Sequence, residues 1–300
     1  MILCCGEALI DMLPRQTEAG ERAFAPYAGG SVFNTAIALG RLGVNTGFLS
    51  GLSTDLFGQI LTSTLAASNV NSELSLRSAR PTTLAFVTLT DGQAQYAFYD
   101  ENTAGRMITP DDLPALPDEI TALFFGGISI PPDPCGRTYE TLMLREAPKR
   151  VTMIDPNIRP DFITDEPGFR TRITRMLAAA DIVKISDEDL AWLGRDVAGL
   201  LAGGARIVCL TEGAKGVTAH FAAGALTVPA RRVAVVDTVG AGDTFNAGLL
   251  AGLERAGVLT KEALTTITAD QLKPALELGV AAAAVTVSRA GANPPWDHEL

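Results

Sequence analysis

The chain has 300 residues, of which 47% are hydrophobic and 19% charged, so residues 1–300 are long enough to bury one substantial core as a single domain. Its formal net charge of −10 at pH 7 disfavours nucleic acids and anionic membranes as partners. Any phosphate recognition must therefore be local.

The amino terminus and the cysteines predict a soluble, cytoplasmic protein. The first five residues lack the basic flank and the length of a signal peptide, and charge or glycine interrupts every longer apolar run. Cys4, Cys5, Cys135 and Cys209 show no metal-ligand spacing, so we expect reduced thiols in apolar strands. The two histidines are isolated, which excludes a histidine metal cluster and a histidine-based catalytic triad.

Buried strands and helices alternate along most of the chain. This alternation predicts a three-layer α/β/α fold, with a mostly parallel sheet and helices on both faces. The predicted strands cover residues 2–5, 46–51, 122–126, 151–155, 182–185, 207–210, 217–221 and 233–236.

Residues 82–98 depart from this pattern. Apolar and polar residues alternate on both sides of Asp91-Gly92, which predicts a β-hairpin. Such a hairpin fits a small separate sheet better than a helix-covered core, and residues 12–28 supply further candidate strands. We therefore expect a small β-sheet lid, formed by about residues 12–28 and 82–107 and inserted in the α/β body.

Two glycines, Gly29 and Gly30, precede a predicted helix that ends near Gly43. Asn34 lies in the first turn of that helix. Paired glycines let backbone amides approach a polar ligand, and an asparagine offers both a donor and an acceptor to hydroxyl groups. The cluster is a candidate substrate site, although a Gly-Gly pair before a helix is often only a turn.

The most informative segment follows the predicted strand at 233–236. Gly240, Ala241 and Gly242 carry almost no side chain and lead into a helix whose first turn holds Asp243. Their N–H groups and the partial positive charge of the helix N-terminus predict an anion hole. A carboxylate in the same turn can accept a proton from an attacking hydroxyl while the N–H groups neutralise a transferred phosphoryl group. The alternative is that Asp243 only caps the helix.

Other nucleotide-binding motifs are missing from the sequence. Neither a P-loop (Gly-x-x-x-x-Gly-Lys-[Ser/Thr]) nor the His-Arg-Asp and Asp-Phe-Gly pair of protein kinases occurs. No Gly-x-Gly-x-x-Gly follows the first strand, which counts against a nicotinamide-dependent dehydrogenase. The anion hole must therefore take the place of a P-loop.

Residues 27–36 and 236–248 resemble the paired signatures of the ribokinase-like (pfkB-type) carbohydrate kinase family. Further matches at residues 6–11, 155–159, 211–216 and 288–292 extend the resemblance over essentially the whole chain. It implies a Rossmann-like α/β/α body with a small β-sheet lid. It also implies transfer of the γ-phosphate of MgATP to a sugar hydroxyl.

The resemblance assigns roles to single residues. Asp243 would be the general base, and Arg159 would join the anion hole at the transferring phosphate, with Asp155 as a partner that orients it. The alternative for Arg159 is a solvated loop arginine. The implied sugar-binding residues are Asp11, Gly29, Gly30, Asn34, Phe98, Asn157 and Asp243. The implied nucleotide-side residues are Ser186, Thr211, Gly213, Gly216, Gly240 and Gly242.

The resemblance also implies two cations. Ser186 and Asp189 replace the Asn and Glu of a family motif, Asn-x-x-Glu, that is associated with Mg²⁺, so we expect Asp189 to hold Mg²⁺ through a water molecule. Asp187, Glu188 and an acidic helix start without a metal are the alternatives. A K⁺ site is expected between the loop near Asp237 and residues 288–291.

Within the family, residues 98–107, 184–186 and 291–295 look most like fructokinases. Kinases of 2-keto-3-deoxygluconate, ribose or nucleosides are alternatives, and so is a catalytically silent sugar-binding regulator. Ser31 stands where ribokinases carry lysine, which counts against ribose. Asp100, in place of an arginine, is expected to repel a sugar acid. Sugar and ATP are the expected partners, and the expected assembly is a homodimer.

Overall fold

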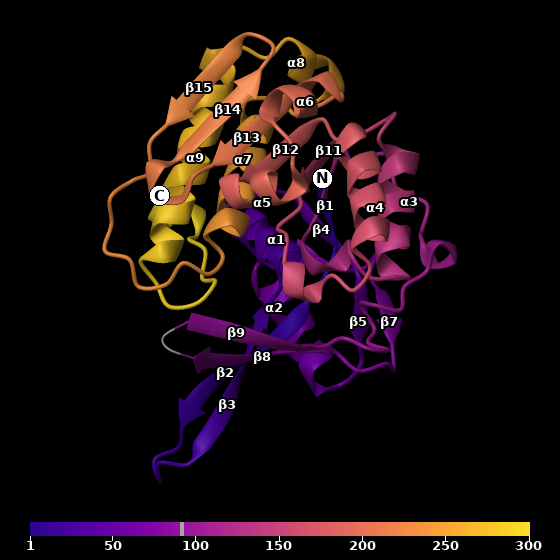
Figure 1. Cartoon of the computed structure of the whole chain (residues 1–300), viewed down its shortest axis with the longest axis vertical. Helices are drawn as coiled ribbons and strands as arrows, with labels where there is room; N and C mark the ends of the chain where they lie inside the picture. Colours follow the sequence, from indigo (N-terminus) through magenta and orange to yellow (C-terminus); the bar gives the residue numbers. More distant parts are fainter. Residues whose placement is uncertain (91–92) are drawn as a thin grey trace.

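The computed structural model describes residues 1–90 and 93–300. A nine-stranded sheet forms its centre, in the order β15-β14-β13-β12-β11-β10-β1-β4-β6 (Figure 1). The strands are β1 (Ile2–Cys5), β4 (Thr46–Leu49), β6 (Val70–Asn71), β10 (Ala122–Gly126), β11 (Val151–Asp155), β12 (Ile182–Ser186), β13 (Ile207–Thr211), β14 (Val217–Phe221) and β15 (Gly224–Val228). Neighbours from β6 to β13 pair in parallel, whereas β14 and β15 form an antiparallel edge. The predicted mostly parallel sheet is confirmed.

Helices cover both faces of this sheet (Figure 1). Side chains of β1 alternate between two apolar cores, with Ile2 and Cys4 in one and Leu3 and Cys5 in the other. The first core is covered by α1 (Ser31–Arg41), α2 (Leu56–Ala67), α7 (Ala241–Arg255), α8 (Lys261–Thr265) and α9 (Ala269–Val287). The second is covered by α3 (Cys135–Glu146), α4 (Glu166–Ala178), α5 (Asp187–Leu193) and α6 (Val197–Ala202).

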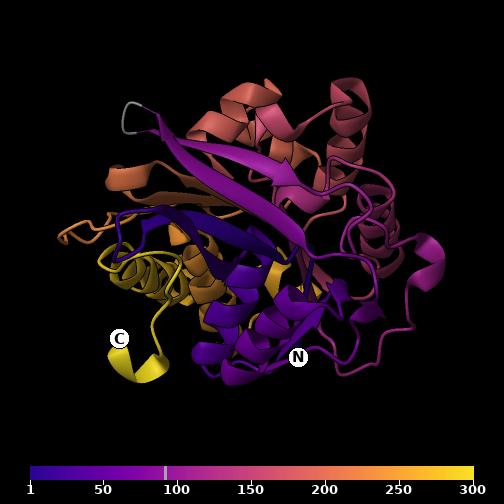
Figure 2. The same ribbon diagram turned by 90° about the horizontal axis from the view of Figure 1, so that it is seen from below.

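A four-stranded sheet lies at the edge of the body, and its β2–β3 hairpin projects away from it (Figures 1 and 2). Its strands, in the order β3-β2-β8-β9, are β2 (Leu9–Gln16), β3 (Arg22–Gly29), β8 (Thr83–Thr90) and β9 (Gln93–Tyr99). Strand β2 pairs antiparallel with β3 and parallel with β8. Both predicted segments therefore contribute to one small sheet. The Asp91-Gly92 turn lies outside the described residues.

Two strand predictions are wrong in detail. Residues 46–51 do not form one strand, because β4 ends at Leu49 and β5 (Gly51–Ser53) pairs with β7 (Leu76–Ser78) in a separate small sheet. Residues 233–236 form an exposed loop, in which Val236 is 63% exposed. This loop leads from the edge strand β15 back to α7, and the Val236 N–H bonds the carbonyl of Val287 at the end of α9 (2.8 Å).

The four cysteines are buried free thiols. In the part of the chain that the structure describes, no helix is both long and apolar enough to cross a membrane. The cytoplasmic location stays a prediction.

Candidate active site

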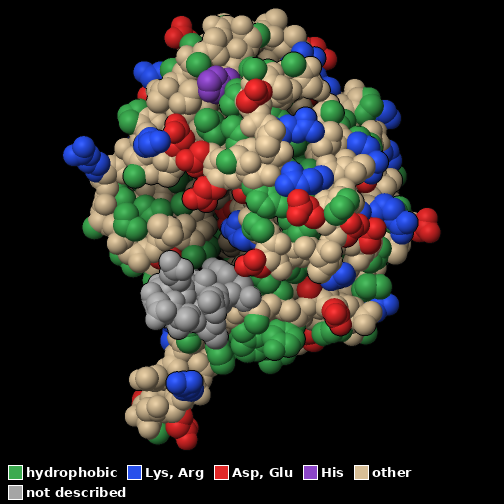
Figure 3. Space-filling view, viewed as in Figure 1, with side chains coloured by type: hydrophobic (Ala, Val, Ile, Leu, Met, Phe, Trp, Pro, Cys, Tyr) green, Lys and Arg blue, Asp and Glu red, His purple; other side chains and the backbone are tan. Residues whose placement is uncertain are grey.

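The candidate site lies where the carboxyl ends of the central strands meet the small sheet. Strand β1 has β4 and β6 on one side and β10 to β13 on the other. The strand order therefore reverses direction at β1. Open α/β sheets bind ligands at such a reversal, beyond the carboxyl ends of the strands. Figure 3 shows Asp and Glu side chains around a hollow in this face of the molecule.

Asp243 is buried in the first turn of α7. The Ser31 hydroxyl donates to its Oδ1 (2.7 Å), the Asn34 amide donates to its Oδ2 (2.9 Å), and Asn157 Nδ2 donates to Ser31 Oγ (3.0 Å). Burial raises the pKa of Asp243 to about 6, and the hydrogen bonds from Asn34 and Ser31 limit the rise. Its side chain does not cap α7. The capping alternative is therefore wrong, and a carboxylate held by neutral donors is available as a base at pH 7.

The turn before α7 leaves backbone N–H groups at the start of the helix, and their role as an anion hole stays a prediction. Gly240 is the N-cap with φ 78°, and a Cβ there would lie 2.7 Å from the Cβ of Ala292, so only glycine fits. Within the described residues, no turn or side-chain acceptor takes up the N–H groups of Gly242 and Asp243. These groups can therefore face an anion at the N-terminus of the helix.

The glycine pair before α1 meets two separate steric needs. A Cβ at Gly29 would lie 2.2 Å from Oδ2 of Asp11, so Gly29 makes room for that carboxylate. Gly30 has φ 107° and packs against Glu7, which allows the turn into α1. That either glycine presents its amide to a sugar stays a prediction.

Asp11 belongs to the small sheet. It lies opposite Ala85 of β8, which lies opposite Phe98 of β9, so Asp11 and Phe98 share one face in a single row. Burial and the negative charge of Asp243 raise the pKa of Asp11 to about 6. The Phe98 ring meets Phe162 of the body edge-on, with 5.0 Å between centroids. These two predicted sugar-binding residues therefore lie on one face, and Asp11 is close enough to Asp243 to sense its charge.

The segment after β11 differs from expectation. Arg159 is exposed, and its guanidinium donates to the carbonyl of Ile158 (3.0 Å). Asp155 is fully buried and pairs with Lys184 (3.0 Å) rather than orienting Arg159. That prediction is wrong because a carboxylate with no exposed surface cannot reach a guanidinium at the surface. A role for Arg159 at phosphate stays a prediction.

The predicted nucleotide-side residues lie together. Ser186 and Thr211 end β12 and β13 and are partners across these parallel strands. Ser186 also caps α5 by accepting from the Asp189 N–H (3.0 Å). Gly213 and Gly216 follow in the next turn, with φ of 53° and 105°. Their contact with a nucleotide stays a prediction.

Asp189 has the chemistry of a magnesium ligand. It is buried and accepts from the Ile158 N–H (3.3 Å), whereas Asp187 and Glu188 are exposed. Burial, together with the negative charge of Asp155, raises the pKa of Asp189 to about 6. Across the described residues, no group of three His, Cys, Asp or Glu side chains could enclose a metal. One carboxylate still suits Mg²⁺, which usually keeps water and binds substrate phosphates.

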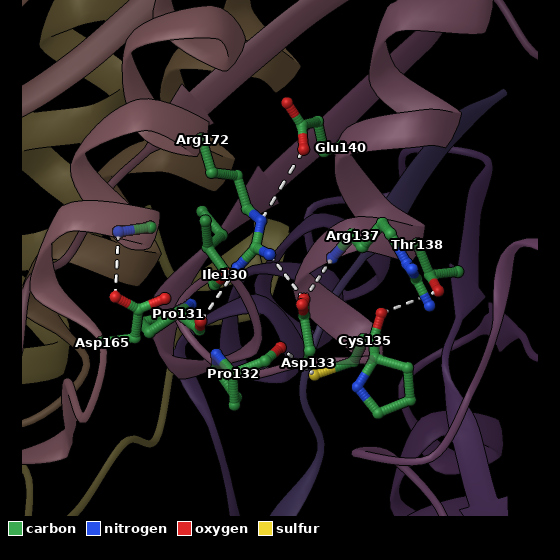
Figure 4. Close-up of polar contacts among 12 residues, drawn as sticks. Ile130, Pro131, Pro132, Asp133, Cys135, Arg137, Thr138, Glu140, Asp165 and Arg172 are labelled. Carbon is green, nitrogen blue, oxygen red and sulfur yellow. Dashed lines mark hydrogen bonds and ion pairs between the residues drawn. The ribbon is translucent and has the colours of Figure 1, made fainter.

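Glu7, just after β1, supports the site from behind. Its carboxylate accepts from the N–H groups of Val32 in α1 and of Ser129 after β10, both at 3.3 Å. The loop after Ser129 is held by Arg172 of α4, which donates to two of its carbonyl oxygens (2.8 Å each) and pairs with Asp133 (Figure 4). The start of α1 is thereby fixed to the body.

Asp100 does not present a free charge to the sugar. Arg106 pairs with it (3.2 Å), the Thr83 hydroxyl donates to it (2.9 Å), and its side chain is 11% exposed. Arg106 also donates to the carbonyl of Asp133 (3.2 Å). The predicted repulsion of a sugar acid by Asp100 is therefore wrong, because the carboxylate is neutralised in a contact that joins the small sheet to the body.

Sequence reasoning missed three polar residues here. Ser31 drew notice only as a departure from ribokinases, although it bonds Asp243. Lys184 lies among the apolar residues at 182, 183 and 185 of β12, and a charge at a buried strand position is a usable signal. Glu7 directly follows the first strand, at the edge where ligand groups gather.

Comparison with known proteins identifies the family of this chain. The model of the pfkB family carbohydrate kinases matches residues 1–299. The chain is 56% identical over 279 residues to a fructokinase of Rhizobium leguminosarum bv. trifolii, covering 91% of this chain and 86% of that protein. It is 35% identical over 265 residues to a fructokinase of Klebsiella pneumoniae, covering 84% of each. A crystal structure of a fructokinase with bound ATP from Xylella fastidiosa matches with a TM-score of 0.89 and 29% identity, over 97% of this chain and 93% of that chain. The chain therefore belongs to the pfkB family of carbohydrate kinases.

Proposed function

We propose that this carbohydrate kinase is a fructokinase, which transfers the γ-phosphate of ATP to a hydroxyl group of D-fructose. The observation that carries the assignment is the 56% identity to a fructokinase over 91% of the chain. The charges of the site support a neutral sugar, because Asp11 and Asp243 are close enough for the charge of Asp243 to raise the pKa of Asp11. The carboxylate of 2-keto-3-deoxygluconate would add a third negative charge.

In this mechanism Asp243 takes the proton from the attacking sugar hydroxyl. The sugar oxygen forms its bond to the γ-phosphorus in line as the bond to the ADP oxygen breaks. The N–H groups of Gly242 and Asp243, at the end of the Gly240–Gly242 turn, offset the charge on the transferring group. Asp11 and Asn34 orient the sugar hydroxyls, and the exposed Arg159 swings to the phosphates when ATP is bound.

Two cations complete the proposal. Asp189 would hold Mg²⁺ through water, and the ion would neutralise charge on the phosphate oxygens. For K⁺, the relevant observation is that the two predicted loops touch. The Asp237 carboxylate accepts from the N–H groups of Val239 (3.0 Å) and Gly291 (2.9 Å), just behind Gly240. A cation bound by carbonyls of these loops would stiffen the anion hole.

The small sheet would act as a lid over the sugar and as a dimer contact. Its face opposite Asp11 carries Phe24, Phe86 and Tyr99, whose rings pack edge-on at 5.0 and 5.4 Å. Phe24 is 42% and Tyr99 is 62% exposed. An exposed aromatic face of this kind suits a second copy of the chain.

The test is an ADP-release assay with D-fructose, 2-keto-3-deoxygluconate and D-ribose, each with MgATP. We expect kcat/KM for fructose to exceed that for the sugar acid by at least about tenfold, the effect of one unfavourable charge contact. A preference for the acid or for ribose would overturn the substrate assignment. Sugar-independent ATP consumption would count against a kinase, and no turnover with any sugar would favour the silent regulator.

A further inference from the structure

A buried polar cluster lies beneath the anion hole, formed by Asp155, Lys184 and Asn246 from β11, β12 and α7. Lys184 Nζ and Asn246 Nδ2 both donate to Oδ2 of Asp155, at 3.0 and 2.8 Å. Asp155 and Asn246 have no exposed surface, and the Lys184 side chain is 7% exposed. Burial opposes the charge of Lys184, but Asp155 more than offsets it, so its pKa is raised and the side chain is an ammonium ion.

This ammonium group lies directly against the predicted anion hole. A Cβ added to Gly242 would lie 3.1 Å from Lys184 Nζ, so the lysine packs against the backbone of the turn. Asn246 lies three residues after Asp243 on the same helix, α7. The cluster is therefore connected through α7 to the turn that holds the base. Lys184 is therefore placed to act on both Gly242 and Asp243.

The cluster is poorly arranged for stability alone. Oδ1 of Asp155 and Oδ1 of Asn246 are buried without a hydrogen-bond partner among the described residues. A buried ion pair is often no more stabilising than apolar side chains of the same size, and unpaired buried acceptors add a cost. A buried network with such defects at the carboxyl ends of the strands indicates a functional rather than a purely structural role.

We propose that Lys184, held by Asp155 and Asn246, is a positioning residue for phosphoryl transfer, whose ammonium supports the Gly242 turn and keeps a positive charge beside Asp243. The proposal rests on the proposed function, in which Asp243 is the base. Among the described residues, the charged groups that act on Asp243 or Lys184 include Glu7 after β1, Asp11 on β2, Asp155 on β11 and Asp189 on α5. Lys184 is a cation among these carboxylates, so its removal leaves the base among like charges.

The first test is Lys184→Met, assayed for kcat, for KM of fructose and for the dependence of kcat on pH. We expect kcat to fall about 10²-fold, the usual effect of removing one preorganised electrostatic group, with KM for fructose changed less than about threefold. The acid limb of kcat should move to higher pH, because Asp243 loses a neighbouring positive charge. Lys184→Arg keeps the charge and should retain more turnover than Lys184→Met. Unchanged kcat and an unmoved limb in Lys184→Met would overturn the proposal.

Because Lys184→Met leaves Asp155 buried and unpaired, the double variant Lys184→Met/Asp155→Asn separates structure from catalysis. If the pair is only structural, the double variant regains wild-type kcat and the proposal fails. If the ammonium is needed beside the Gly242 turn, the double variant melts near the wild-type temperature and kcat stays low. Its acid limb should return toward the wild-type position, because Asp155→Asn removes a negative charge that acts on Asp243. Lys261→Met is the matched control, because Lys261 pairs with Asp181 (2.7 Å) at the other end of the sheet, and its kcat should not change. If the wild type phosphorylates a sugar other than fructose, the substrate proposal fails, and the Lys184 variants are compared on that sugar.

Discussion

Asp243 can be altered chemically without a change of shape, because its two oxygens bond neutral side chains of α1. Asp243→Asn cannot accept the hydroxyl proton, so we expect kcat to fall by about 10²–10⁴-fold or more, with binding of fructose and ATP nearly intact. Steady-state kinetics measures kcat, and titration calorimetry measures the binding of fructose and ATP. Asp270→Asn, in the exposed first turn of α9, is the control. If Asp243→Asn retained half of the wild-type kcat, Asp243 would not be the general base.

Ser31 offers a finer test of the same base. In Ser31→Ala, Oδ1 of Asp243 loses its donor, so the carboxylate is less stable and its pKa rises. The acid limb of kcat should move up by about one pH unit, the equivalent of one hydrogen bond to a charged group. Ser31→Thr keeps a hydroxyl and should keep the wild-type limb. An identical profile in the alanine variant would show that Ser31 does not tune the base.

Single residues were predictable where local sequence marks a position. Asp243 and Asn34 each follow glycines in the first turn of a helix, and both signals are local. Their contact, across 209 positions of sequence, depends on how α1 and α7 pack and has no local signal. Asp155 and Arg159 lie close together in sequence, which suggests that they pair. Burial decides the partner instead, and Lys184 on the next strand is the cation that is buried with it.

At the scale of elements, the small sheet is expected to close when sugar binds. Closure excludes water and limits wasteful ATP hydrolysis. Hydrogen exchange of β2 and β8 should therefore slow on addition of fructose, while β14 and β15, at the far edge of the main sheet, serve as the internal control. ATP hydrolysis without sugar should be slow. Equal exchange in β2 and β8 with and without fructose would argue against a lid.

The pairing of α7 with α9 depends on glycines at close approach. A Cβ on Gly248 would lie 2.5 Å from the Cα of Gly279, so Gly248→Ala must push the two helices apart. We expect a loss of about 1–3 kcal/mol in the free energy of unfolding, measured by urea denaturation. Gly105→Ala, where a Cβ meets nothing closer than 3.6 Å, is the control. Wild-type stability in Gly248→Ala would mean that the helices adjust without strain.

Elements were predictable where composition and topology agree. The apolar strands of the sheet centre are buried on both faces, so their composition alone identifies them. Residues 233–236 have the same composition but lie exposed, because they follow the edge strand β15 and lead back to α7. The β-propensity of these residues predicts a strand, but it does not show whether a neighbouring strand is available to pair with them in the sheet.

At the scale of the whole molecule, three carboxyl groups with raised pKa meet at one end of the sheet. Asp11, Asp189 and Asp243 each have a pKa of about 6, with burial as the first cause. The folded chain therefore binds protons more tightly than the unfolded chain between about pH 4 and pH 6. The stability that these groups contribute is fully present below about pH 4 and is lost as pH rises through about 6.

Comparison of the wild type with Asp243→Asn isolates the contribution of one carboxylate to the pH dependence of stability. Near pH 4 the two proteins should unfold with similar free energies, because the wild-type side chain is largely protonated when folded. At pH 8 the wild type must bury a charge, and the gap between a pKa of about 6 and an ordinary value of about 3.9 corresponds to up to about 3 kcal/mol in favour of the variant. Urea denaturation at both pH values measures this difference, and kcat of the wild type should rise over the same interval as the base ionises. If the variant is no more stable than the wild type at pH 8, the buried charge costs nothing, and the acid limb of kcat belongs to another group.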